Sequence, residues 1–321
     1  MKTGLADILL QQDLITNSEK ENIQRERPLS VYWDLRSLLY LGILLTTTAV
    51  GILIYKNINT IGHNVLLAII TFLTIACFAY CFKKSNGYQH TKINATGIWP
   101  DYILLVGCLL LLALAGYLQV QYQFFGNRWG LALFIPMVLL FISAYYFDHI
   151  GVLSVAITNL AAWAGIAITP TAILQQNDFS EERVMFTGLI LGAVLIALAE
   201  LSIVKKIKMH FAFTYRNFGI HLLFIATLSI LFYYEAYYLL WFLALSVLAF
   251  LLFKSAVKER SFYFLVVTLL YFYIGFSYVM VRLLLSGDNE IGFYGIILYF
   301  IFSGIGLIAL FKKFQKKLSI K

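Results

Sequence analysis

Residues 129–169 read WGLALFIPMVLLFISAYYFDHIGVLSVAITNLAAWAGIAIT, a stretch that is apolar almost throughout. A helix needs about 20 apolar residues to cross a hydrocarbon core of about 30 Å, so this stretch is too long for a single crossing. Asp148, His149 and Gly151 interrupt it near the middle, and residues of these types favour a tight turn. The stretch therefore predicts two membrane-spanning helices joined by that turn.

The rest of the chain has the same character, with 61% hydrophobic and 12% charged residues among 321 and a mean hydropathy of +0.83. Soluble domains carry about 25% charged residues, so lipid must surround most of this chain. The apolar runs are continuous and not alternating, which favours helices over barrel strands. We predict an all-α polytopic bundle of ten spans, at residues 37–55, 62–82, 102–118, 129–146, 150–169, 185–204, 218–233, 236–253, 262–285 and 291–311.

The basic residues predict how these spans are oriented. With the amino terminus inside, the cytoplasmic segments hold all 24 Lys and Arg residues except Lys56, Arg128, Arg183 and Arg282. Cytoplasmic loops of membrane proteins carry such an excess of Lys and Arg. We therefore expect an even number of crossings with both termini cytoplasmic. The formal net charge of +8 belongs to these loops, and no nucleic acid is expected as a partner.

Three regions follow from this pattern. Residues 1–36 are predicted to form a cytoplasmic helical hairpin and linker, residues 37–311 the ten-helix membrane domain, and residues 312–321 a basic cytoplasmic tail. In the hairpin, Thr16 and Glu19 have the spacing of a capping box, and Pro28 ends the second helix.

The span 150–169 is unusual because small and hydroxylated residues fill it. Ser154, Thr158 and Ala162 share one helical face with Gly165, and Gly151 is a further small residue that we expect in helix packing. Small residues let helices approach closely, so we expect this face to pack in the centre of the bundle.

Asn159 falls near the midpoint of the same span and needs a hydrogen-bond partner there. The first interpretation is a fastener between helices. The alternative is that Asn159, with Ser154 and Thr158, lines a cavity for a substrate.

Other candidates are few. Gly188 and Gly192 form a Gly-x-x-x-Gly motif, which indicates a close helix contact inside the chain or with a second copy in a homo-oligomer. Glu200 and Arg282 lie near span ends, where snorkelling to the interface competes with a functional role, substrate binding in the case of Glu200. Asp148 and His149 are expected at the cytoplasmic surface.

Signatures of enzyme chemistry are missing from the sequence. It has no Gly-rich phosphate loop, no paired metal-ligand motif and no nucleophile elbow. We predict no catalytic residue, cofactor or metal, and therefore a protein that is not an enzyme.

The amino-terminal layout resembles a known family. A short helical hairpin, with Leu14, Ile15 and Thr16 before a Glu-containing second helix, leads directly into the spans over residues 5–92. This is similar to bacterial predicted membrane proteins classified as domain of unknown function 2157. The resemblance implies a multi-pass protein of the bacterial inner membrane and implies no activity.

Three functions remain open. The first is a non-enzymatic inner-membrane protein that docks a cytoplasmic partner through residues 1–36. The second is a carrier for a small neutral or apolar solute, built from two five-span halves. The third is a membrane enzyme that uses Asp148, His149 or Glu200 at the cytoplasmic face.

Overall fold

The structure is a computed structural model of the chain. It describes residue 16 and residues 32–56, 62–85, 87–91, 98–168, 181–286 and 289–319. This part of the chain is helical throughout, apart from short turns. The helices are α3 (Tyr32–Lys56), α5 (His63–Lys84), α6 (Ile98–Tyr122), α7 (Trp129–Phe147), α8 (Ile150–Ile168), α10 (Glu182–Val204), α11 (Phe211–Tyr233), η1 (Glu235–Tyr237), α12 (Tyr238–Lys258), α13 (Phe262–Leu285) and α14 (Asn289–Ser319).

Nine of the described helices, α5 to α14, are long and apolar enough to cross a membrane. In α3 the corresponding apolar stretch is the shorter segment Ser37–Ala49. A polytopic helical bundle is therefore confirmed, and α3 stands at the place of the first predicted span. Most of the predicted hairpin of residues 1–36 lies outside the described residues, and α3 begins within its last part, at Tyr32.

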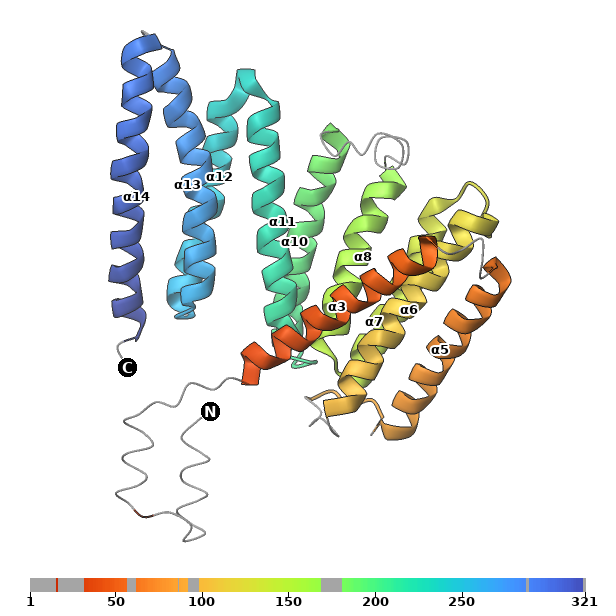
Figure 1. The fold of residues 1–321 in the computed structure, drawn as a ribbon. Helices are drawn as coiled ribbons and strands as arrows, with labels where there is room; N and C mark the ends of the chain where they lie inside the picture. The colour runs from red at the N-terminus through yellow and green to blue at the C-terminus, as the bar shows by residue number, and fades with distance from the viewer. Residues whose placement is uncertain are drawn as a thin grey trace. The chain divides into compact units, whose positions relative to one another are not determined.

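The chain divides into two compact units, Met1–Leu66 and Leu67–Lys321, and the division falls in the first turn of α5. In the second unit, successive helices run antiparallel (Figure 1). The turn predicted at Asp148 and His149 is confirmed, because α7 ends at Phe147 and α8 begins at Ile150.

Helix packing within the second unit is pairwise. The most extensive contacts join α7 to α8, α10 to α11, and α12 to α13. The central helix is α11. Half of the residues in its 18-residue apolar stretch are buried inside the bundle, whereas no residue in the corresponding stretch of α14 is buried. Buried residues of α11, α12 and α13, among them Phe224, Leu231, Leu245 and Leu265, form one apolar core.

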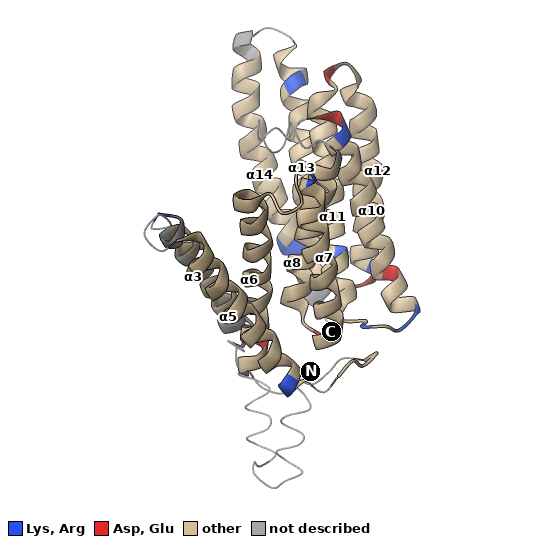
Figure 2. Cartoon of the chain, turned by 90° about the vertical axis from the view of Figure 1, so that its right-hand side faces the viewer, with Lys and Arg blue, Asp and Glu red and all other residues tan. Residues whose placement is uncertain are grey.

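Charged residues lie mostly toward the ends of the helices (Figure 2). Lys84 ends α5, Lys205 follows α10, and Lys258 ends α12. We call this side of the second unit the basic end. The other side, which carries the turns after α6, α11 and α13, is called the opposite end.

Candidate functional site

Asn159 lies at the centre of α8, and its side chain is used in a contact between helices. Its Nδ2 donates to the main-chain oxygen of Leu133 on α7 at 3.0 Å, and Asn159 is 7% exposed. The hydroxyls of Ser154 and Thr158 donate to main-chain oxygens of Ile150 and Ser154 in their own helix. The structure therefore does not bring these three polar groups together.

The predicted central position of the small-residue face of α8 is wrong in part. Thr158 and Ala162 on that face are exposed, and Gly165 is half-buried, whereas Val152 and Ala156 are buried. Small side chains permit a close helix contact but do not require one, and the larger apolar side chains of α8 face the bundle instead.

Gly188 and Gly192 make their close contact inside the chain. A Cβ atom added to Gly192 would lie 2.9 Å from the main-chain nitrogen of Leu223 and 3.0 Å from the oxygen of Gly219, both on α11. At Gly188 it would lie 3.2 Å from the Cβ of Ala226. The motif therefore joins α10 to α11 as a closely packed pair.

The sequence predicts Asp148 and His149 at the surface, and this prediction is wrong because both side chains are buried. The Asp148 side chain is 3% exposed and lies 2.8 Å from both Lys208 Nζ and His210 Nε2. The backbone of Asp148 is left-handed, with φ of 60°, and closes α7. His149 is 3% exposed, and its Nδ1 accepts from the main-chain N–H of Val152 at the start of α8.

Lys208 connects three segments at the basic end. It is fully buried, its main-chain N–H donates to the oxygen of His90, and its Nζ donates to the oxygen of Thr91. Its ammonium also lies 5.6 Å from the centre of the Tyr88 ring. A buried charge requires such compensation. This cluster therefore joins the turn after α7 and the turn after α10 to residues 87–91.

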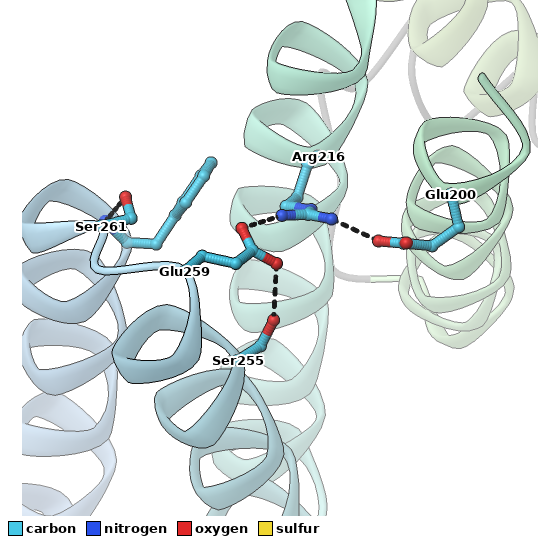
Figure 3. A network of polar contacts seen from close by, with 6 residues as sticks. Glu200, Arg216, Ser255, Glu259 and Ser261 are labelled. Atoms are coloured by element: carbon cyan, nitrogen blue, oxygen red, sulfur yellow. Dashed lines mark hydrogen bonds and ion pairs between the residues drawn. The ribbon is translucent and has the colours of Figure 1, made fainter. Parts of the chain in front are cut away.

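Glu200 belongs to a second cluster, which Figure 3 shows from close by. Arg216 on α11 binds Glu200 on α10 through Nη2 and Glu259 after α12 through Nη1. Ser255 donates to the second oxygen of Glu259 at 3.1 Å. We call this network the Arg216 clamp. It holds α10, α11 and the end of α12 together and places Glu200 in a different cluster from Asp148.

The turn between α12 and α13 positions the clamp. Glu259 caps α12 through its main-chain N–H, which donates to the oxygen of Ser255. Arg260 follows with φ of 54°, and Ser261 then caps α13 by accepting from the N–H of Phe264. Because this turn is so short, Glu259 and Tyr263 both lie beside the first half of α11, where they contact Arg216 and Asn217 respectively.

The site that sequence reasoning missed is His221. Its Nδ1 lies 2.9 Å from the hydroxyl of Tyr271, and its Nε2 lies 3.2 Å from the hydroxyl of Tyr263, both on α13. The Tyr263 hydroxyl donates to Oδ1 of Asn217 at 2.7 Å. We call these four residues the His221 chain. A search of the predicted spans for His as well as for Glu and Arg would have found it.

With the Asn217 amide oxygen facing Tyr263, these contacts set the direction of the hydrogen bonds. Tyr263 donates to Asn217, so its oxygen must accept from His221 Nε2–H. The other nitrogen, Nδ1, is then an acceptor and receives the Tyr271 hydroxyl. With a neutral imidazole, each of the three hydrogen bonds of the His221 chain therefore has one donor and one acceptor.

The His221 chain reaches the middle of the bundle from its basic end. Tyr263 is the second residue of α13 and is 43% exposed. His221 lies ten residues after Phe211 and twelve before Tyr233, at about 15 Å from the start of α11. Beyond it, Tyr271 stacks on Phe224 with ring centres 5.0 Å apart, and the core continues with Leu228 and Leu231.

Arg282, the second predicted ionisable residue in a span, lies near the opposite end. It donates to the Tyr278 hydroxyl at 2.9 Å and lies 3.4 Å from Glu235. Its guanidinium also covers the Tyr238 ring at 4.7 Å. Arg282 thus reaches toward the acidic residue at the helix end, as the snorkelling interpretation predicts.

A separate cavity of about 200 Å³ lies between α6, α7 and α8 toward the opposite end. Leu112, Leu133 and Ile166 are among its mostly apolar walls. Gln119 also lines it, but its amide binds the main chain at Phe125 and Gly126 and thereby fixes the turn after α6. The cavity therefore gains no free amide from Gln119.

Metal binding finds no support among the described residues, where no group of three or more His, Cys, Asp or Glu could hold an ion. Cys77, Cys81 and Cys108 are free thiols on α5 and α6.

No curated protein and no solved structure matches the chain. A match to a family model covers α3 to α7 and the first residues of α8. It confirms the resemblance carried by the amino-terminal segment: residues 8–153 match the model of the family described as predicted membrane protein (DUF2157).

Proposed function

We propose that this multi-pass membrane protein is a carrier for a small neutral solute, with its solute path between α11 and α13. The observation that carries the proposal is the His221 chain, a polar route that enters from the basic end and stops at mid-depth. Polar groups inside a membrane bundle are costly and mark solute and ion pathways.

The polar contacts lie where two closely packed helix pairs meet. Gly192 and Gly219 join α10 tightly to α11, and Gly275 lets α12 approach α13, since a Cβ there would lie 2.1 Å from Leu245. The His221 chain and the Arg216 clamp both cross from the first pair to the second. Hydrogen bonds and ion pairs can exchange partners at such a boundary, whereas close glycine packing cannot.

The polar route continues toward the basic end only. Phe224, Leu228 and Leu231 close it beyond Tyr271 with apolar side chains. A continuous pore would need polar groups on both sides of this barrier. A half-route that ends at mid-depth corresponds instead to one state of an alternating-access carrier. The excess of Lys and Arg at the basic end supports a cytoplasmic position for this end of the route.

A neutral solute fits the groups that are present. Arg216 is paired with two carboxylates, so its charge is compensated within the clamp. The His221 chain offers phenol, amide and imidazole groups, which bind uncharged donors and acceptors. This site replaces the predicted one at Asn159, whose amide is bound to Leu133. The predicted docking role of residues 1–36 stays a prediction.

The test is counterflow of labelled solutes in proteoliposomes that contain the full chain. The probes are glycerol, alanine, leucine, glucose and uracil, all without net charge at pH 7. We expect protein-dependent exchange of at least one probe, lost when Asn217→Leu and Tyr263→Phe are combined. The matched control is Tyr273→Phe, because Tyr273 lies on the same helix but binds Ser303 on α14.

Exchange in the control with loss in the double variant supports the proposal. Exchange no faster than in empty vesicles for every probe would overturn it. So would equal exchange in the double variant and the unaltered chain.

A further inference from the structure

His221 stands apart from the other ionisable residues of the bundle. Among the Asp, Glu, Lys, Arg and His residues of the described spans, it lies farthest from a helix end. The others, such as Glu200 and Arg282, lie close enough to a helix end to reach the interface. An ionisable side chain at mid-depth is a functional candidate by default. Histidine also has the side chain whose ordinary pKa, about 6.5, is nearest to neutral.

We propose that His221 is a proton-binding site and that the proton is the coupling ion of the carrier. The coupling part of this inference rests on the proposed carrier function. Proton binding by His221 does not depend on it. The geometry that supports it is the His221 chain, in which both imidazole nitrogens face a tyrosine hydroxyl and one of these hydroxyls is exposed at the basic end.

The chain is complete in either direction. With the Asn217 amide turned over, Nδ2 donates to the Tyr263 oxygen, Tyr263 donates to Nε2, and Nδ1–H donates to Tyr271. In this direction the unprotonated imidazole nitrogen, Nε2, accepts from the exposed tyrosine. A hydronium ion at Tyr263 can then give its proton to the phenol oxygen while the Tyr263 hydroxyl proton passes to Nε2. Water is left behind, Tyr263 stays neutral, and imidazole becomes imidazolium.

The protonated state is supported by the same partners. The imidazolium donates through both nitrogens, to the oxygens of Tyr263 and Tyr271. Once the Asn217 amide turns back, Tyr263 donates onward to its Oδ1. The hydroxyl hydrogen of Tyr271 points away from His221 in this state, because its oxygen accepts from Nδ1–H. What protonation changes is the Tyr263 end of the His221 chain, where Nε2 turns from an acceptor into a donor.

The charged groups of the neighbouring helices do not compete for this proton. Glu200 of α10 and Glu259 after α12 are both paired with Arg216. From α13 the facing groups are Tyr263 and Tyr271. On the α7 and α8 side, Tyr145 of α7 binds Tyr215 of α11 at 3.0 Å, and α8 carries no charged residue among its described positions.

Coupling has a defined thermodynamic consequence. If one proton accompanies one neutral solute, a gradient of one pH unit, alkaline inside, supports a tenfold accumulation of solute. A carrier without proton coupling equalises the solute and accumulates none.

The first experiment observes the proton itself. The full chain with ¹⁵N-labelled histidine is placed in nanodiscs, and its five His residues are followed by NMR between pH 5 and 8, with His221→Gln assigning the signal. We expect the His221 signal to titrate in this range and its midpoint to move in Tyr271→Phe, which keeps the imidazole but removes the Nδ1 partner. Tyr273→Phe should leave the midpoint unchanged.

The second experiment measures accumulation of the solute found by counterflow, under the gradient of one pH unit. Tenfold accumulation by the unaltered chain and none by His221→Gln supports coupling. A His221 signal that does not change between pH 5 and 8 would overturn the proton site. Solute exchange that does not depend on pH in either the unaltered chain or His221→Gln would overturn the proton coupling but would still support the carrier function. Titration of His221 without exchange of any solute would overturn the carrier function but would still support the proton-binding site.

Discussion

At the scale of single residues, His221 shows why the site is not readable from hydropathy. The predicted span begins at residue 218 because the preceding Thr214, Arg216 and Asn217 are polar, and this places His221 near a helix end. The helix in fact begins at Phe211. Partners elsewhere in the bundle, Glu200 and Tyr263 among them, satisfy the side chains of Arg216 and Asn217. Local composition contains no information about such partners.

The close contact of α10 with α11 predicts the effect of Gly192→Ala. The added methyl group would meet the main chain of α11 at Leu223 and Gly219, which cannot rotate away. Overpacking of this kind costs about 1–3 kcal/mol. We expect a lower midpoint of thermal unfolding in detergent. The control is Gly116→Ala on α6, where nothing lies within 4 Å of the added atom. Equal midpoints for the two variants would contradict the packing.

The Arg216 clamp makes a second prediction, about coupling between residues. Arg216→Gln leaves Glu200 and Glu259 facing the same site without a cation, so it should lower the thermal midpoint more than Glu259→Gln does. In a double-mutant cycle the combined variant should lose less than the sum of the two single losses, because the shared interaction disappears only once. Strict additivity would show that Arg216 and Glu259 have no coupling energy in the folded chain.

At the scale of elements, the apolar runs predict where helices exist better than where they end. The span predicted at 262–285 has the bounds of α13, and the turn between α7 and α8 is found where Asp148 and His149 indicate it. In contrast, α14 continues to Ser319, far past its predicted end at residue 311. Lys-rich turns can remain helical beyond the hydrocarbon, since water there satisfies their side chains.

The face that α8 buries could not be predicted, for a related reason. Small residues such as Ala162 fit a helix contact and a lipid-facing surface equally well. Only the neighbouring helices decide between the two. Asn159 was more informative, because an amide at mid-depth needs a partner whichever face it lies on.

The bond from Asn159 to Leu133 predicts a structural effect without a transport effect. Asn159→Ala removes a hydrogen bond between α7 and α8, and such bonds are worth about 0.6 kcal/mol on average and up to about 1.7 in a membrane protein. We expect a lower thermal midpoint and unchanged solute exchange. Thr158→Ala is the matched control, since its exposed hydroxyl binds only its own helix. Loss of exchange in Asn159→Ala with an unchanged midpoint would instead support the predicted cavity at Asn159.

At the scale of the whole molecule, the family match and the proposed site occupy different parts of the chain. The match covers residues 8–153, whereas the His221 chain and the Arg216 clamp are built from α10 to α13. The charge pattern could be predicted from sequence because it depends only on which connections carry Lys and Arg. The order of helix packing could not, because several helices offer similar apolar surfaces.

The charge pattern makes one last prediction, about the number of crossings. Since α5 runs from the opposite end to the basic end, an amino terminus on the basic side requires α3 to cross the membrane. The apolar stretch described in α3 is short. Whether the number of crossings is odd or even is therefore the better test of whether α3 crosses, because it determines the side on which the amino terminus lies. In a background with Cys77, Cys81 and Cys108 replaced by Ala, single cysteines at Thr16, Asn127 and Lys258 can be labelled with a membrane-impermeant maleimide in spheroplasts.

Asn127 lies in the turn after α6, at the opposite end, and Lys258 ends α12 at the basic end. We expect the cysteine at position 127 to react in intact spheroplasts and the one at 258 only after permeabilisation. Position 16 should behave like position 258, because ten crossings return the amino terminus to the basic side. If position 16 reacts together with position 127, then α3 does not cross, and the amino terminus lies outside. If position 258 reacts first, the whole bundle is inverted, and the route to His221 opens away from the cytoplasm.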